Sequence, residues 1–534
     1  MSPGYLLWLC LVAIIWLQSL NGTNTSFPSY SSQLKQQLSI SQVQLNNLAF
    51  ASDAGKFFAF LSGIAAGYLP LWVVLLFGSF LGFIGYGLQY LFLANHLNLS
   101  YVQIFALNFI SGNSICWINT VCYSVIIRNF PSDYSQVAVG ITTSYQGLSA
   151  KIYTDIVHAA FSSAPHKPHK TAKAHLLLNS ISPPIVSVIA APLFATKIDV
   201  VGRPRAGSMK VGFFLLFLII AVVTGIYSVI SSLGLTSRKV SPVAGAIVIA
   251  VFLLAPLLVP IIYLIGEVRK TDQDTGAKSR VCDFALEENG LKKEEGKDDR
   301  EIREVVPVGV KEEIGVMLLL KRLDFWLFFF VYLFGATLGM VFLNNLGQIA
   351  ESRGYSGTTD FVSWCSSFVF FGRIIPSLMD DCFSRRKYMM ISEPASLVLY
   401  MPLIAGAFFF LLLDTKMALY VSTAIIGACT GAISSVAVTI TKELFGTNGF
   451  SMNYNLVIAN IPVGSFAYNY VAARLYRKEG KGDGACMGME CYRTTFIIWG
   501  SLSAVGTFLA IILFARTRQF YSKKLQNMNS SLVA

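Results

Sequence analysis

Runs of about 20 apolar residues recur along the whole chain, and no other feature restricts its fold as strongly. A helix of that length crosses the hydrocarbon core of a bilayer and satisfies its own backbone hydrogen bonds there. We therefore predict an all-α, polytopic membrane protein. Fourteen segments are candidate membrane-spanning helices: 5–30, 42–67, 70–94, 100–127, 133–157, 174–196, 211–234, 241–266, 324–348, 359–379, 388–413, 416–440, 451–474 and 494–515.

The composition agrees with this fold class. Charged residues make up 13% of the 534 residues, against about 25% in average globular chains, and the mean hydropathy is +0.59. These values exclude a disordered chain, a collagen-like repeat and a secreted disulfide scaffold. A net charge of +12 is also found in nucleic-acid binders, but here Lys and Arg are scattered between apolar runs. Basic residues at membrane edges explain the charge, so we expect a lipid bilayer as partner and no nucleic acid.

The first apolar stretch, 6–20, has the length of a signal-peptide core. Residues 1–5 lack the Lys or Arg that precedes such a core, so we interpret the stretch as a retained first helix. The distribution of Lys and Arg over the short loops then favours a cytoplasmic location for both termini. It does not distinguish the plasma membrane from an endomembrane.

One long polar stretch, 269–304, interrupts the apolar pattern after the eighth segment. It holds nine Lys or Arg residues and eleven Asp or Glu residues. Such mixed charge with few apolar residues cannot bury a core, so we expect a disordered cytoplasmic loop that divides the chain into two halves.

The two halves open with the same spacing between a helix cap and a cation. Ser41 precedes Lys56 by fifteen residues, and Thr358 precedes Arg373 by fifteen. At about 1.5 Å per residue, both cations lie about 22 Å along their helices, in the cytoplasmic third of a core about 30 Å thick. Two matching halves are typical of secondary transporters, whose solute site lies between the halves.

Two of the nine cysteines share a glycine-rich loop that this topology places outside. Cys486 and Cys491 form either a short disulfide or two free thiols. The other seven lie singly in helices or on the inner side, where reduced thiols are the default.

Several short motifs, in a fixed order, carry a family resemblance. They are GTNTSFPSYS at 22–31, SQVQLN at 41–46, SDAGK at 52–56, FIGYG at 83–87, SICWINTVC at 114–122, IRNFP at 127–131, DFW at 324–326, ELFG at 443–446 and NYN at 453–455. With them the chain resembles the plant nodulin-like and nuclear fusion defective-type proteins of the major facilitator superfamily. The resemblance covers nearly the whole chain outside 268–310.

This resemblance implies two six-helix bundles, so that the fourteen segments include two extra helices. The implied organisation is an N-terminal bundle (1–200), two extra helices (201–267), a charged cytoplasmic loop (268–322), a C-terminal bundle (323–516) and a cytoplasmic tail (517–534).

The superfamily also has a cytoplasmic signature after the second helix of a half, which implies a charge latch that holds the inward gate closed. The second half matches this signature with Gly372, Arg373, Asp380, Arg385 and Arg386. In the first half Gly63 and Gly67 remain, but 68–72 replaces the charged residues, so that a first-half latch is incomplete.

Charges within apolar segments are the first candidates for a solute site, because each costs at least about 2.5 kcal/mol in the membrane. Arg373 either neutralises an anionic solute or forms the latch with an aspartate, Asp380 or Asp381. Asp53 and Lys56 share a helical face and form either a self-neutralising pair or a solute- or proton-responsive pair.

Uncharged polar residues are the second set of candidates. They either line the cavity or form hydrogen bonds between helices: Asn21, Asn24, Asn119, Tyr145, Gln146, Asn344, Asn345, Asn455 and Asn460. Lys151 and Asp155 are expected to form a structural pair near the outer end of their segment. Asn98 is the sequon expected outside both the membrane and a helix.

The chain contains no catalytic or nucleotide-binding motif, so we expect no enzyme activity and no cofactor. We also expect no metal site, because a lysine separates His166 from His169. The leading hypothesis is a secondary transporter that moves a small polar or anionic solute by alternating access. The alternative is a membrane scaffold or regulatory protein whose loop, 268–322, binds a cytoplasmic partner.

Overall fold

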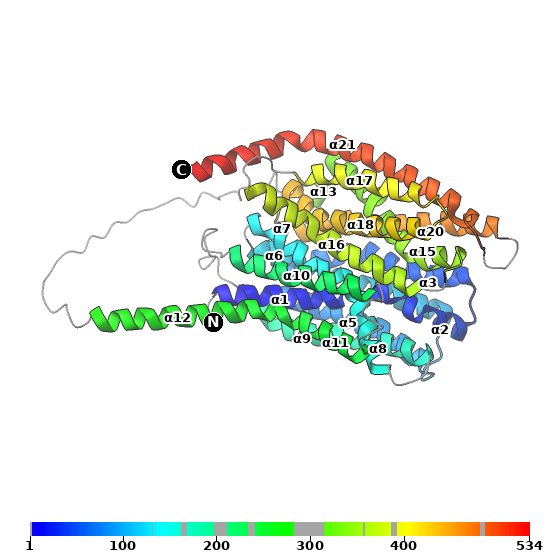
Figure 1. The fold of residues 1–534 in the computed structure, drawn as a ribbon, viewed down its shortest axis with the longest axis horizontal. Helices are drawn as coiled ribbons and strands as arrows, with labels where there is room; N and C mark the ends of the chain where they lie inside the picture. The colour runs from blue at the N-terminus through cyan, green and yellow to red at the C-terminus, as the bar shows by residue number, and fades with distance from the viewer. Residues whose placement is uncertain are drawn as a thin grey trace.

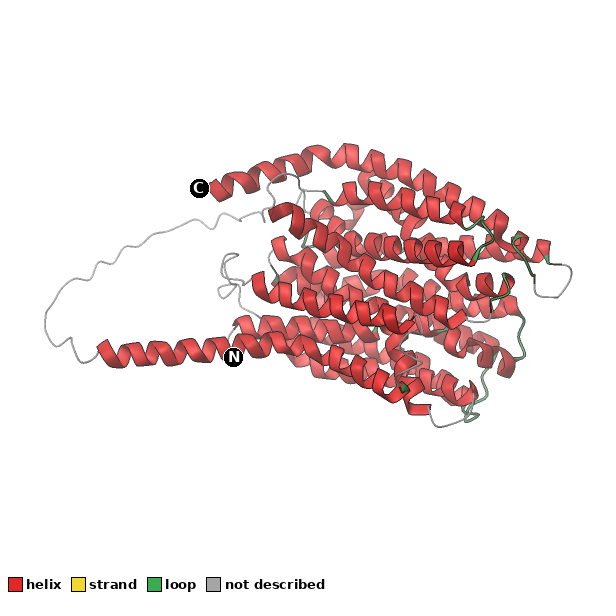
Figure 2. Cartoon of the chain, in the orientation of Figure 1, coloured by secondary structure: helices red, strands yellow, loops and turns green. Residues whose placement is uncertain are grey.

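In the part of the chain that it describes, the computed structural model consists of helices joined by short loops (Figure 2). It describes residues 3–130, 132–161, 168–196, 211–232, 241–281, 314–355, 358–385, 392–480 and 486–533. Within these ranges every regular element is a helix, which confirms the predicted all-α class. Most of the charged loop, 282–313, lies outside the described residues.

The helices form two groups separated by three extra elements. The first half contains α1 (Pro3–Leu20), η1 (Thr23–Ser26), α2 (Pro28–Leu38), α3 (Gln42–Gly55), η2 (Lys56–Phe58), α4 (Ala59–Tyr68), α5 (Leu71–Leu93), α6 (Tyr101–Asn129), α7 (Ser132–Gly147), α8 (Ser149–Phe161) and α9 (Pro168–Ala195). The extra elements are α10 (Val211–Ser232), α11 (Pro242–Leu254) with η4 (Ala255–Leu257), and α12 (Leu258–Val281). The second half contains α13 (Val316–Leu319), α14 (Leu323–Tyr332), a π-helical turn η5 (Leu333–Thr337), α15 (Leu338–Ser352), α16 (Thr358–Arg385), α17 (Glu393–Phe410), α18 (Lys416–Phe445), α19 (Phe450–Ile458), α20 (Asn460–Glu479) and α21 (Glu490–Val533).

Helix starts follow local side-chain chemistry. The hydroxyl of Ser41 accepts a hydrogen bond from the backbone N–H of Gln44, whose side chain accepts one from the backbone N–H of Ser41. Ser100 and Gln103 form the same capping box at the start of α6. These caps satisfy backbone groups that a helix leaves unpaired at its first turn. The predicted cap at Ser41 is confirmed.

Thirteen helices of the described chain are long and apolar enough to cross a membrane. They correspond to thirteen of the fourteen predicted segments. The exception is 133–157, which is not one continuous helix because a turn at Leu148 separates α7 from α8. In Figure 1, α7 and α8 lie toward opposite ends of the bundle, so that together they form one broken helix, the fifth of six in the first half.

The two halves repeat the same packing. α5 packs between α6 and α9, as α17 packs between α18 and α21. α3 packs on α6, as α16 packs on α18, and the broken helix α7–α8 corresponds to α19–α20. The predicted repeat of two helical bundles is therefore present in the fold.

The halves meet along two boundaries, which we call seams. At the first seam α7 packs on α16; at the second, α3 and α4 pack on α20 and α19. α10 packs on both α16 and α7, while α11 packs on α8 and α12 on α1. α10 therefore covers the first seam, while α11 and α12 lie on the first half.

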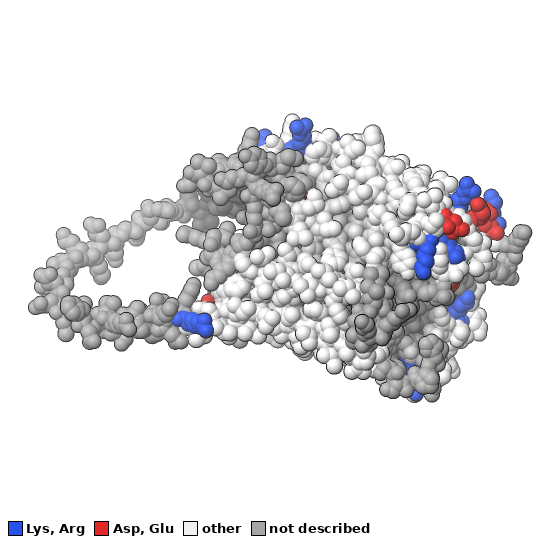
Figure 3. Space-filling view, in the orientation of Figure 1, with Lys and Arg blue, Asp and Glu red and all other residues white. Residues whose placement is uncertain are grey.

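The bundle has two distinct ends (Figure 1). The start of α1 and the end of α21 lie at one end, together with the end of α12, and we call this the loop end. The opposite, disulfide end carries α2 and the connection from α20 to α21. On the face in Figure 3, the described charged residues gather toward both ends and leave an uncharged belt between them. This distribution is that of an integral, multi-pass membrane protein.

Candidate functional site: a cavity between the two halves

A cavity lies between the two halves, with an empty volume of about 1570 Å³ that includes the part open to solvent. Its walls come from η1, α2, α3, η2, α5, α6 and α7 on one side and from α14, α15, α16, α18, α19 and α20 on the other. Seven of the predicted site residues line it: Asn24, Asp53, Lys56, Asn119, Gln146, Asn344 and Arg373. A site shared by both halves is the arrangement on which alternating access depends.

Arg373 reaches across the first seam. Its Nη1 donates hydrogen bonds to the backbone oxygen of Thr143, at 2.8 Å, and to Oε1 of Gln146, at 2.6 Å. Both acceptors are uncharged, and among the described side chains Arg373 forms no ion pair. Its Nε is buried without a hydrogen-bond partner in the described structure. Arg373 therefore brings a positive charge to the cavity that no described carboxylate neutralises.

Asp53 and Lys56 form an ion pair on the first half, and Asp53 also contacts the second half. Lys56 Nζ lies 2.6 Å from Asp53 Oδ1, and both side chains are buried. Asp53 Oδ2 accepts hydrogen bonds from Ser465 Oγ, at 2.5 Å, and from Asn344 Nδ2, at 3.4 Å. Because α3 ends at Gly55, Lys56 lies at the bend between α3 and α4. The pair is thus both self-neutralising and part of the second seam.

The charges on the cavity wall do not cancel. Among the described lining residues, Asp53 is negative while Lys56 and Arg373 are positive. The ion pair removes one charge of each sign and leaves that of Arg373. A solute that carries one negative charge would complete the balance, because a buried charge is costly unless it is paired.

Five tyrosines line the cavity, and three of them, Tyr123, Tyr332 and Tyr454, come from α6, α14 and α19. The rings of Tyr123 and Tyr454, from opposite halves, meet edge to face with centroids 5.2 Å apart. Tyr332 donates to Ser434 Oγ at 3.4 Å. The sequence does not single out these three, because aromatic residues are frequent throughout the apolar segments and no spacing sets these apart.

The second seam is tightly packed toward the loop end. A Cβ atom added to Gly63 would lie 2.8 Å from the Cα of Met452 on α19, so that only glycine allows this approach of the two helices. Asn455 Nδ2 donates to Ser62 Oγ, at 3.2 Å, and to Thr120 Oγ1, at 2.9 Å. Asn455 therefore joins helices of opposite halves, beside the cavity lining.

The first seam is also closed toward the loop end. Lys442 Nζ donates to Ser135 Oγ at 2.7 Å, and Ser377 Oγ donates to the backbone oxygen of Gln136 at 3.0 Å. A Cβ on Gly140 would lie 1.9 Å from Ser377 Oγ. These contacts join α7 of the first half to α18 and α16 of the second.

The remaining polar candidates form contacts between helices. Asn21 Nδ2 donates to Asn119 Oδ1 at 2.9 Å, and Asn345 Nδ2 donates to Asn469 Oδ1 at 2.7 Å. Thr337 donates to the side chain of Asn460. Tyr145 lies outside the central cavity and lines a smaller one between α7 and α10. Apart from Asn119, these residues do not line the central cavity.

The gating candidates divide into described and undescribed residues. A Cβ on Gly372 would lie 1.9 Å from the backbone oxygen of Ala428, so Gly372 permits close packing of α16 on α18. The side chains of Asp380, Asp381 and Arg385, and all of Arg386, lie outside the described residues. The proposed latch between Arg373 and Asp380 or Asp381 remains a prediction.

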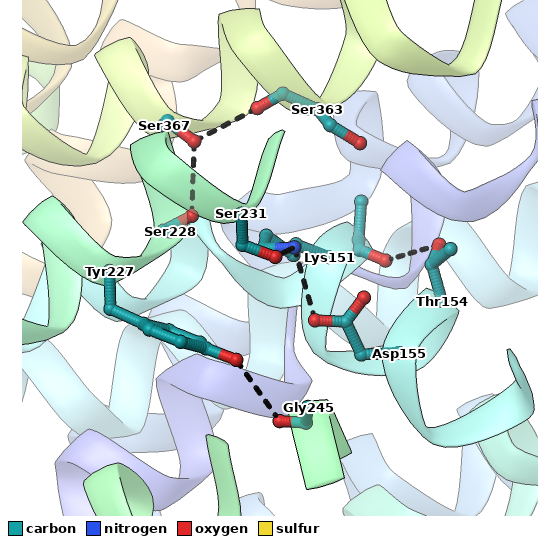
Figure 4. Close-up of polar contacts among 10 residues, drawn as sticks. Lys151, Thr154, Asp155, Tyr227, Ser228, Ser231, Gly245, Ser363 and Ser367 are labelled. Atoms are coloured by element: carbon teal, nitrogen blue, oxygen red, sulfur yellow. Dashed lines mark hydrogen bonds and ion pairs between the residues drawn. The ribbon is translucent and has the colours of Figure 1, made fainter. Parts of the chain in front are cut away.

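Three further predictions concern the disulfide end. Cys486 and Cys491 are joined by a disulfide. Asn98 is exposed in the loop between α5 and α6. Lys151 Nζ lies 3.1 Å from Asp155 Oδ2, as expected of a structural pair (Figure 4). His166 lies outside the described residues.

Comparison with known proteins shows the family. The profile of the Nodulin-like family matches residues 7–261, and that of the NFD4 C-terminal domain matches residues 307–523. Protein NUCLEAR FUSION DEFECTIVE 4 of Arabidopsis thaliana is 37% identical over 542 residues, which cover 97% of this chain and 90% of the relative.

Solved structures show the fold. The E. coli fucose:proton symporter FucP superposes with a TM-score of 0.51 at 12% identity, covering 95% of this chain and 97% of the other. The proton:xylose symporter XylE, solved with a bound bromo-deoxyglucose, has a TM-score of 0.59 at 10% identity, covering 95% of both chains. Both are transporters of the major facilitator superfamily. The chain therefore belongs to the nodulin-like, nuclear fusion defective-type family and has the fold of major facilitator transporters.

Proposed function

We propose that the protein is a secondary transporter that moves a small anionic solute through the central cavity by alternating access. The observation that carries this proposal is the guanidinium of Arg373, which lines the cavity and contacts only neutral acceptors among the described residues. A guanidinium pairs with a carboxylate through two parallel N–H donors, and its free Nε suits this geometry.

The contacts of Arg373 also supply a link between solute binding and movement. Arg373 belongs to the second half, whereas Gln146 belongs to the first. An anion that pairs with Arg373 competes with Gln146 and weakens a contact that holds the first seam together. A solute can shift the equilibrium between two conformations only by the difference between its binding free energies for them.

The solute charge follows from the lining. Asp53 is the one carboxylate among the described lining residues, and Lys56 neutralises it. We therefore expect a monoanion to be preferred over a neutral solute of the same shape. The fold also includes proton symporters, so the experiment below is run with and without a pH gradient.

Uptake into proteoliposomes tests the proposal with matched pairs of solutes. Nicotinate and nicotinamide have similar shapes and differ mainly in charge. Lactate and glycerol form a second, less closely matched pair of an acid and a neutral solute. We expect uptake of at least one acid above the level of empty liposomes, with its neutral counterpart at that level. Equal rates for acid and neutral counterpart would remove the anion preference. No flux of any solute, together with loss of binding partners on deletion of 282–313, would favour the scaffold alternative.

A further inference from the structure

α10 lies across the first seam and holds α16 from the outside. Ser228 Oγ of α10 lies 3.0 Å from Ser367 Oγ of α16, and both side chains are buried there (Figure 4). A Cβ on Gly225 would lie 2.5 Å from Phe370 Cε1 and 2.7 Å from Phe371 Cζ. Only a glycine allows α10 to approach these rings so closely.

The same helix is joined to the first half by a charged contact. Lys151 Nζ of α8 donates to Ser231 Oγ of α10 at 3.0 Å while it pairs with Asp155 (Figure 4). Lys151 is 7% exposed, so this contact is shielded from competing water. α11 packs on α8 and α12 on α1, which attaches the extra elements to the first half at further points.

The contacts on the two sides of α10 differ in strength. Those to α16 include a hydrogen bond between hydroxyls and the packing of Gly225 on two rings. On the other side, Lys151 joins α10 to the first half, and the neighbouring extra elements α11 and α12 are packed on α8 and α1 of the same half. A hydrogen bond with a charged partner is about twice as strong as one between neutral groups. A movement of the halves would therefore break the contacts to α16 first.

The contacts with α16 lie close to the solute site. Ser367 precedes Arg373 by six residues on the same helix, and Phe370 packs edge to face on Tyr145 of α7 with centroids 5.8 Å apart. Ser228 lies four residues before the end of α10, in the half of the helix that faces the disulfide end. α16 is thus held between α7 and α10 beside the residue that we assign to solute binding.

From this arrangement we propose that α10 is a conformational clasp. It moves with the first half and releases α16 each time the first seam opens toward the disulfide end. This inference rests on the proposed function, because it assigns the clasp to the movement that admits a solute. The clasp is thus a role for α10 outside the two six-helix bundles.

Reversible cross-linking tests the clasp. The background replaces the cysteines outside the disulfide by serine: Cys10, Cys116, Cys122, Cys282, Cys365, Cys382 and Cys429. A bifunctional methanethiosulfonate then joins Ser228→Cys to Ser367→Cys, across the clasp. The matched control joins Lys151→Cys to Ser231→Cys, between α10 and the first half. Each variant is compared with itself before cross-linking and after reduction.

We expect cross-linking at 228 and 367 to lower the uptake rate of the transported acid at least about tenfold, with recovery on reduction. Cross-linking at 151 and 231 should change the rate by less than about twofold. Unchanged uptake in the first pair would overturn the clasp, as would an equal loss in both pairs.

Distances between pairs of spin labels test the clasp without a transport measurement. Spin labels replace lipid-facing residues near the disulfide end: Ile230 on α10, Val421 on α18 and Leu177 on α9. We expect more than one distance population for 230–421 and a single one for 230–177, measured in nanodiscs at two temperatures. A single population for 230–421, or several for 230–177, contradicts the clasp. A background variant without flux contradicts the proposed function, while these distances still test the clasp.

Discussion

Arg373 on α16 donates a 2.6 Å hydrogen bond to Gln146 on α7, across the boundary between the two halves. The contact joins a charged group to a neutral one, and no carboxylate among the described side chains pairs with the guanidinium. The same guanidinium is thus both part of the seam and part of the cavity wall.

Substitutions of Arg373 should distinguish the effect of its charge from the effect of its hydrogen-bond geometry. We predict that Arg373→Ala abolishes uptake of the transported acid and that Arg373→Lys retains part of it, because lysine keeps the charge but not the fork of donors. A lost hydrogen bond to a charged partner is worth about 1.5–3 kcal/mol, or roughly 10- to 100-fold in affinity. Initial rates in proteoliposomes measure this.

Asp380→Asn is the matched control for the latch interpretation. If Arg373 serves the solute, the control should retain its KM within about twofold. Normal transport by Arg373→Ala would show that neither the anion site nor the latch is correct.

The buried ion pair of Asp53 and Lys56 should affect the free energy of unfolding. We predict that Asp53→Ala lowers the free energy of unfolding by about 3–5 kcal/mol, because it leaves a buried ammonium unpaired. The double variant Asp53→Ala, Lys56→Met should recover most of this loss. Thermal unfolding in one detergent measures the effect, with Glu490→Ala as control, since Glu490 pairs with Arg493 and both side chains are exposed. An unchanged melting temperature in Asp53→Ala would contradict the assignment of an essential buried pair.

Gly63 should control the loop end of the second seam. We predict that Gly63→Ala forces α4 and α19 apart, because the new Cβ would lie 2.8 Å from backbone. Ser124→Cys reports the change, since Ser124 Oγ lies 2.7 Å from Ser451 Oγ across the same seam. Its labelling by a maleimide should accelerate several-fold in the cysteine-depleted background.

Gly67 provides the control on the same helix. A Cβ at Gly67 would meet nothing within 4 Å, so Gly67→Ala should label at the parent rate. Equal labelling of the two glycine variants would mean that the close approach at Gly63 does not hold the seam.

The disulfide should be detectable by mass. We predict that alkylation of the intact protein without reductant leaves Cys486 and Cys491 unmodified, and that both react after reduction. The free cysteine Cys429 on α18, alkylated after unfolding, serves as internal control. Modification of both loop cysteines before reduction would exclude the bond in the native protein.

The sequence predicted the helices well because each membrane span is a local property of about 20 residues. It placed Lys56 and Arg373 at equal depth, and the structure brings both to one cavity. The candidate segment 133–157 consists of two helices, α7 and α8, because hydropathy does not detect the turn at Leu148. Ser465 also escaped prediction, because its role depends on a contact with Asp53 from the other half.

The polar residues show the same division between local and tertiary information. Asn119 and Asn455 look alike within their segments, yet one lines the cavity and the other joins the halves beside it. Which face of a helix points inward follows from packing between distant segments. A single sequence contains that information only indirectly.

A density map of the protein with its transported acid would show whether Arg373 binds the acid group. We expect the acid group within hydrogen-bonding distance of the Arg373 guanidinium, between α7 and α16, with the contact to Gln146 lengthened. An acid group bound elsewhere, with Arg373 paired to Asp380 or Asp381, would contradict this expectation.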